Sequence, residues 1–135
     1  MRATLYKNSK TVRAMTATGA KVTGAVNGDS VDRQQTGAGD YRSVMFVVLS
    51  ATATDGSHVF TMEDSPDGTT WTAVAAGFLQ GSLPTLTATD DDVVKDFGYS
   101  GNQRYVRIVL TSSGTTTGAI IGAAAVLYGT AGWKR

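Results

Sequence analysis

His58 is the only histidine of this 135-residue sequence, and imidazole is the general base that hydrolases use most often. A serine hydrolase would need a carboxylate such as Asp55 or Asp64 to orient it, and a serine such as Ser57 or Ser65 as nucleophile. All of these residues fall at turns or strand ends of one predicted hairpin, and no nucleophile-elbow motif is present. The pattern therefore predicts a histidine at the surface or at a strand end, without a catalytic role.

Clustered acids at 90–92, followed by Asp96, are candidates for a hard cation such as Ca²⁺. Three consecutive residues of extended backbone point alternately, so at most two of these carboxylates can converge. The sequence has no cysteine and one histidine, which leaves too few nitrogen and sulfur ligands for a typical zinc site. We expect a solvated acidic loop and no metal or other cofactor.

Glu63 and Asp64 are a second candidate for acid–base chemistry, because glycosidases place two carboxylates across one cleft. Adjacent residues of a strand point to opposite faces, so these two side chains cannot flank one glycosidic bond. We therefore expect no enzymatic activity.

Nucleic-acid binding needs basic side chains with aromatic side chains between them. The net charge is +1 and the pI is about 8.0, whereas nucleic-acid-binding domains usually show a clearer basic face. We expect no direct nucleic-acid partner. The two best candidate clusters are Tyr6 with Lys7 and Lys10, and Tyr105 with Arg104 and Arg107.

A hairpin is predicted over residues 58–74. Phe60 and Met62 alternate with Val59 and Thr61, which is the period of a strand with one buried face. After a turn, a second β-prone segment follows from Thr70 to Val74.

The turn of this hairpin has a physical reason at each position. Pro66 has the φ angle that the first central position of the turn needs, and Asp67 fits the second central position. Gly68 enters the left-handed region without a steric penalty. We expect the Asp67 carboxylate to accept hydrogen bonds from nearby backbone amides in the turn that starts at Ser65. Trp71 is expected to cover the hairpin. The segment resembles the Asp-box turn of sialidases in its turn chemistry, and this likeness implies no sialidase activity.

Other strands are indicated along the chain. The apolar run Ser43–Ser50 predicts a central strand buried on both faces, and Asn27–Gly28 predicts a two-residue hairpin whose return strand spans 30–34. Tyr105–Thr111 alternates with Arg107 outward, and Ala119–Gly129 is the last strand. The fold class is therefore all-β: a single β-sandwich or jelly-roll domain of about eight short strands over 21–135, preceded by an N-terminal arm or edge strand at 1–20.

The longest apolar run, Ala119–Tyr128, is Gly- and Ala-rich and about half the roughly twenty residues that a membrane-spanning helix needs. The first residues lack the apolar core of a signal peptide. We expect neither secretion nor a membrane partner.

Basic residues gather at the two ends of the chain. Lys134 and Arg135 close it, and four basic residues precede Asp29, the first acid. Between Asp40 and Asp96 the acids dominate. Basic ends favour docking on an acidic surface. The four N-terminal basic residues are Arg2, Lys7, Lys10 and Arg13.

The order of these segments resembles small virion structural proteins of tailed bacteriophages, specifically capsid cement (decoration) proteins. The likeness covers about residues 40–129 and rests on the apolar strand VMFVVLS, the Ser-Pro-Asp-Gly-Thr-Thr-Trp hairpin, the strand YVRIVLT and the Gly/Ala-rich last strand. It contains no catalytic motif.

This resemblance implies a many-copy structural protein on the capsid surface of the virion. Such a subunit binds the major capsid protein from outside, bridges capsomers and stabilises the shell, and it forms homo-oligomers, dimers or trimers. We expect the N-terminal basic residues to contact the shell. Gly122, Ala123, Ala124, Ala125 and Val126 are candidates for subunit packing, with a plain core strand as the alternative.

A receptor- or carbohydrate-binding module of a phage tail or head fibre is the alternative function. That function needs exposed aromatic side chains, and Trp71 or Trp133 could supply them.

Overall fold

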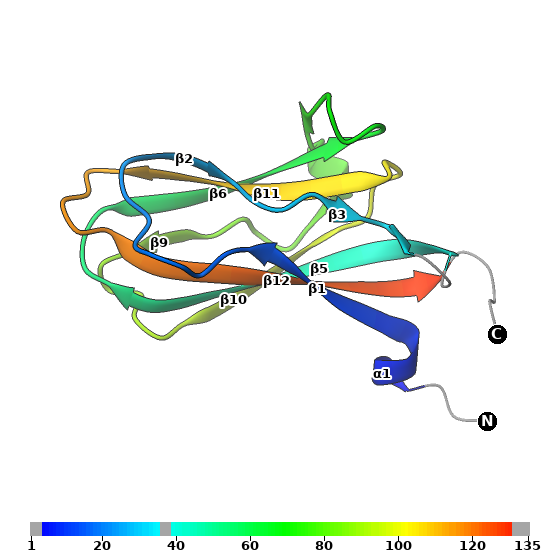
Figure 1. Ribbon diagram of the computed structural model, residues 1–135, viewed down its shortest axis with the longest axis horizontal. Helices are drawn as coiled ribbons and strands as arrows, with labels where there is room; N and C mark the ends of the chain where they lie inside the picture. Colours follow the sequence, from blue (N-terminus) through cyan, green and yellow to red (C-terminus); the bar gives the residue numbers. More distant parts are fainter. Residues whose placement is uncertain (1–3, 36–38, 131–135) are drawn as a thin grey trace.

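The computed structural model describes residues 4–35 and 39–130 and contains two antiparallel sheets packed face to face (Figure 1). The predicted all-β sandwich is therefore confirmed, while the jelly-roll connectivity stays a prediction. In the described residues, eight strands have three or more residues and four have two. The two longest, of 15 and 12 residues, are not the short strands that we expected.

The first sheet, sheet A, is the lower layer in Figure 1 and has the order β1-β12-β5-β10-β8, with β4 beside β5. Its first element, β1, is an edge strand that follows the four-residue helix α1 (Leu5–Asn8). The strands are β1 (Ser9–Met15), β12 (Ala119–Thr130), β5 (Gly39–Ala53), β10 (Val94–Tyr99), β8 (Leu79–Gln80) and β4 (Gln34–Gln35).

The second sheet, sheet B, has the order β2-β11-β6-β7, with β3 beside β11 and β9 beside β6. The short 3₁₀ helix η1 (Ala76–Phe78) connects β7 to β8. The strands are β2 (Gly24–Asn27), β11 (Tyr105–Ser113), β6 (Ser57–Ser65), β7 (Thr72–Ala73), β3 (Val31–Asp32) and β9 (Thr85–Thr87).

The core lies between the sheets. The Phe97 ring of sheet A stacks on Phe46 at 5.8 Å between centroids and lies 6.3 Å from Phe60 of sheet B. On β11, Ile108 and Leu110 face the same interior and are fully buried. These side chains occupy the alternate positions that the period-2 pattern predicted, so hydrophobic burial sets the register of the central strands.

The predicted central strand is present as part of β5, between β12 and β10, but it is buried on one face only. Phe46 and Val48 point into the core, whereas Met45 and Leu49 are exposed. The prediction of burial on both faces was wrong, because no second layer covers this side of sheet A in the described residues.

The hairpin predicted at Asn27–Gly28 was also wrong. The strands on either side of it, β2 and β3, do not pair with each other, and both pair with β11. Gly28 donates its N–H to the Ile108 carbonyl at 2.7 Å, and a side chain at this position would collide with backbone oxygens of Ala14 and Ile108. Glycine is therefore needed here for close packing along one interrupted strand, not for a turn.

Candidate functional site

His58 is the second residue of β6, at a strand end as the sequence suggested, but its side chain is buried and not at the surface. Its Nδ1 is 2.7 Å from the Ser112 hydroxyl, and its Nε2 is 3.1 Å from the Asp55 backbone carbonyl. Because a carbonyl can only accept, Nε2 carries a proton, and with a neutral ring the Ser112 hydroxyl donates to Nδ1. Ser112 is itself buried, so neither side chain faces a space that could hold a substrate.

The Asp55 carboxylate has a structural task in the β11–β12 loop. It accepts the backbone N–H groups of Thr116, Thr117 and Gly118, the last at 2.7 Å. These bonds, from Gly118 first, lower the pKa of Asp55. The carboxylate holds the β11–β12 loop against the β5–β6 turn, so the Asp-His-Ser set predicted as a weak hydrolase candidate is not assembled.

Carboxylates of the acidic loop accept hydrogen bonds from backbone N–H groups. Asp90 accepts the N–H of Thr87 at 2.7 Å, and Asp91 accepts the N–H of Ala53 at 2.6 Å. Asp96 faces outward from β10. Over residues 4–35 and 39–130, no three acidic or histidine side chains gather as a metal ion would require.

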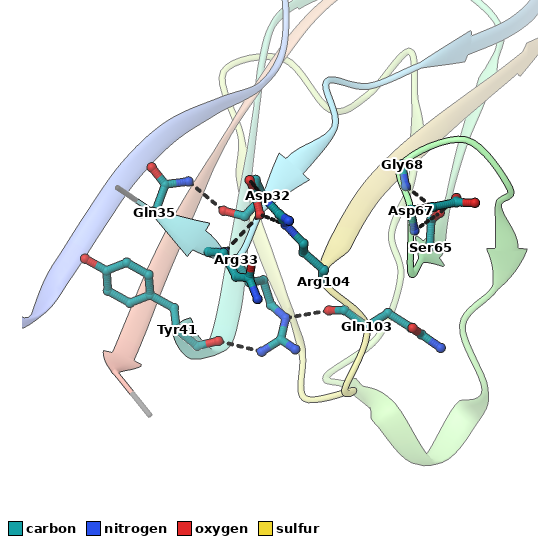
Figure 2. Close-up of polar contacts among 10 residues, drawn as sticks. Asp32, Arg33, Gln35, Tyr41, Ser65, Asp67, Gly68, Gln103 and Arg104 are labelled. Atoms are coloured by element: carbon teal, nitrogen blue, oxygen red, sulfur yellow. Dashed lines mark hydrogen bonds and ion pairs between the residues drawn. The ribbon is translucent and has the colours of Figure 1, made fainter. Parts of the chain in front are cut away.

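The hairpin turn has the predicted chemistry (Figure 2). Ser65, fully buried, accepts the N–H of Gly68 at 2.9 Å and donates its hydroxyl to Asp67. Asp67 accepts the N–H groups of Thr69 and Thr70, both at 2.9 Å, and these bonds lower its pKa. Pro66 is exposed at the tip, and the strands β6 and β7 pair as a hairpin. These residues build structure and present no reactive group.

Glu63 and Asp64 point to opposite faces, as predicted. Glu63 binds the Arg107 guanidinium at 2.7 Å on the outside of sheet B, and that guanidinium lies 4.2 Å from the centre of the Trp71 ring. Asp64 instead accepts a hydrogen bond from the Tyr99 hydroxyl at 2.8 Å between the sheets. Trp71 therefore covers the outer surface of the hairpin under an arginine that a carboxylate holds in place.

A polar network at one end of the sandwich was missed by sequence reasoning (Figure 2). Arg33 donates to the backbone carbonyls of Gln103, at 2.7 Å, and Tyr41. Its neighbour Asp32 accepts two hydrogen bonds from Arg104, each 2.9 Å long. These arginine nitrogens donate to backbone and carboxylate oxygens of the same chain, so the network joins separate segments at this end of the sandwich.

Exposed apolar side chains of the described residues gather on the outward side of sheet A, which we call the apolar face. Of the ten exposed large apolar side chains, five lie on it, with exposed fractions between 39% and 60%, and a sixth, Leu5 of α1, borders it. Soluble monomers rarely gather exposed apolar side chains in this way. The face consists of Ser9, Thr11, Arg13, Ile120, Gly122, Ala124, Val126, Tyr128, Ser43, Met45, Val47, Leu49, Val94, Asp96 and Gly98.

Two grooves of similar size cross the apolar face. One, of about 440 Å³, runs from Leu5 across Val126 and Met45 to Gly98. The other, of about 430 Å³, is lined by Gly122, Ala123 and Ala124, with Ala17, Leu49 and Ile120 at its sides. The face is therefore uneven, with projecting apolar side chains separated by grooves. Such a surface suits the binding of another protein.

The candidate packing residues divide between the two sides of β12. Gly122, Ala124 and Val126 are partly exposed on the apolar face, whereas Ala125 is fully buried and Ala123 packs against the core. Sequence reasoning found this strand but missed its neighbours on β5, because a continuous apolar run carries no sign of which face is uncovered.

The candidate shell-contact residues that the structure describes lie in α1 and β1, at one edge of sheet A. Lys7 is in α1, which projects from sheet A on the side away from sheet B (Figure 1), and Lys10 is exposed on β1. Arg13 forms an exposed ion pair with Asp29 at 2.6 Å. Arg2, like Trp133, lies outside the described residues.

Within the described part of the chain, no helix has the length and hydrophobicity to cross a membrane. Comparison with protein-family models and with curated protein sequences gives no match.

Proposed function

We propose that this chain is a structural subunit of a tailed-bacteriophage virion, a capsid cement protein that binds the outside of the shell and stabilises it by bridging capsomers. The apolar face is the single observation that carries the proposal of a protein-binding role. The virion assignment rests on the resemblance of the strand–hairpin–strand order. Self-association as a dimer or trimer is part of the proposal.

Contact with the shell is assigned to the N-terminal segment. Lys7 and Lys10 are exposed and have no carboxylate partner within residues 4–35 and 39–130. An acidic patch on a capsid protein would attract both ammonium groups, and the attraction would weaken as salt is raised. Leu5 and Tyr6, exposed on the same helix, add apolar contact area.

The test is to mix the purified protein with shells that lack it and to measure binding and the heat resistance of the shells. Saturable binding and a higher melting temperature are expected. Lys7→Glu with Lys10→Glu should weaken binding, while Lys95→Glu, an exposed lysine on β10, is the matched control. Shells that neither bind the protein nor melt at a higher temperature would contradict the proposal.

A carbohydrate-binding role in a tail or fibre is less well supported by the geometry. One face of the Trp71 ring is occupied by the Arg107 guanidinium, which Glu63 fixes in turn. Glycan-array binding that Trp71→Ala abolishes would favour this alternative over the cement role.

A further inference from the structure

We infer that the apolar face binds a second copy of this chain, related by a two-fold axis that runs parallel to the strands between β12 and β5. The inference takes from the proposed function only the idea of self-association and does not depend on shell binding. It is carried by charge, shape and area.

The charges come from one row of the sheet. The pairings Arg13↔Ala124, Ala124↔Val47 and Val47↔Asp96 place a cation and an anion on the same row, at opposite edges of an apolar centre. A two-fold axis along the strands exchanges the two edges and leaves the row unchanged. Arg13 of each copy therefore faces Asp96 of the other, and the pair forms twice.

The same axis places projecting side chains of one copy over grooves of the other. It lays β12 of one copy over β5 of the other, because these strands are equidistant from the axis. Two rows further along, Gly122 pairs with Leu49, and Ala17 of the same chain packs over Gly122. Each exposed Leu49 therefore meets the partner's groove that Ala17, Gly122 and Ala124 line. Around the Arg13 row the sheets can approach to the spacing of about 10 Å of aligned sheet packing, which the long Arg13 side chain can span. α1 stands on the same face at the Tyr128 end, so there the partner packs against α1 and not against the sheet.

The area is sufficient for a dimer. Four strands about 4.8 Å apart, over about eight residue steps of 3.3 Å, give a flat projection on the order of 500 Å² per copy. Protein interfaces need about 1,000 Å² of total buried surface, and side-chain relief adds to the projection. We therefore expect a modest dimer whose dissociation constant lies in the range of about 1–100 µM.

Sedimentation velocity across this concentration range measures the dimer directly. Leu49→Asp should weaken association by about 100-fold or more, because it buries an unpaired charge. Leu49 is 54% exposed, so folding should be unaffected and circular dichroism can verify this. The matched control is Val59→Asp on the outer side of sheet B, 39% exposed, which should leave association unchanged.

A mixing experiment tests the symmetry. Arg13→Glu and Asp96→Lys should each weaken the homodimer by about tenfold, because like charges then face each other twice. Mixing the two variants should restore a heterodimer of wild-type strength, since both contacts become opposite in charge. Asp29→Asn, which removes only the intrachain partner of Arg13, should leave the dimer intact.

A wild-type chain that stays monomeric at about 200 µM, above the expected dissociation constants, would overturn the inference. So would dissociation by Val59→Asp, or a mixture that associates no better than its components. A monomer that still binds shells would overturn this inference and the self-association in the cement proposal, and would leave the proposed shell binding standing. A dimer that binds no shell would overturn the proposed shell binding and leave this inference standing.

Discussion

The Tyr99 hydroxyl donates a hydrogen bond to the Asp64 carboxylate at 2.8 Å and thereby joins the two sheets. Tyr99 belongs to β10 of sheet A, and Asp64 belongs to β6 of sheet B. The same hydroxyl accepts the backbone N–H of Gln103 at 3.1 Å, and the Arg33 guanidinium lies 5.9 Å from the ring centre. One buried phenol therefore fixes the sheets and the β10–β11 loop together.

Tyr99→Phe should destabilise the fold by about 1–3 kcal/mol, because it leaves the Asp64 carboxylate and the Gln103 N–H without this partner. Urea unfolding at pH 7 measures the loss. Tyr105→Phe is the control, since the Tyr105 ring is partly exposed on the outside of sheet B, and it should stay within about 0.5 kcal/mol of wild type. Equal stability of the Tyr99→Phe variant and wild type would contradict the cross-sheet role.

Alkaline pH should weaken the fold through the same residue. Burial, together with the bond to Asp64, raises the pKa of Tyr99 to about 12 from its ordinary value of 10.0. The folded state then holds a proton that the unfolded state releases, so stability is complete below about pH 10 and is lost as the pH rises toward 12. The free energy of unfolding measured from pH 8 to 11.5 should fall less steeply in Tyr99→Phe, and parallel curves would count against this assignment.

Acid should loosen the β11–β12 loop. The pKa of Asp55 is lowered by the N–H groups of Gly118, Thr116 and Thr117, so its contribution is present above the unfolded value of about 4 and is lost as the pH falls through the folded value. Asp55→Asn should therefore lower the urea midpoint at pH 7 and differ less from wild type at pH 3. Asp92→Asn, which changes an exposed carboxylate outside the proposed dimer contact, serves as the control. A difference that grows at pH 3 would contradict the prediction.

His58→Ala should cost about 2–4 kcal/mol of stability, because it empties a buried site and leaves the Ser112 hydroxyl without its acceptor. Thermal and urea unfolding measure the change. Val59→Ala, at the next position of the same strand with an exposed side chain, should cost far less. A His58→Ala variant that unfolds like wild type would place the imidazole at the surface after all.

Local patterns in the sequence determined the strands and the hairpin. Buried residues alternate with outward ones in β6, at Phe60 and Met62, and in β11, at Val106, Ile108 and Leu110. Such an alternation can be recognised in the sequence whenever a strand buries one face. The Ser65–Gly68 turn could be predicted because its hydrogen bonds are made within a few residues of the chain. The opposite orientations of Glu63 and Asp64 followed from strand geometry for the same reason.

Tertiary structure alone decided what covers each strand. The run Ser43–Ser50 is apolar at almost every position, so the sequence could not tell that Met45 and Leu49 lie on an uncovered face. His58 meets Ser112 from 54 residues away, and Gly28 is required by the carbonyls of Ala14 and Ile108. Burial and long-range hydrogen bonding depend on which segments meet in space, whereas a periodic pattern reports only how each segment is turned.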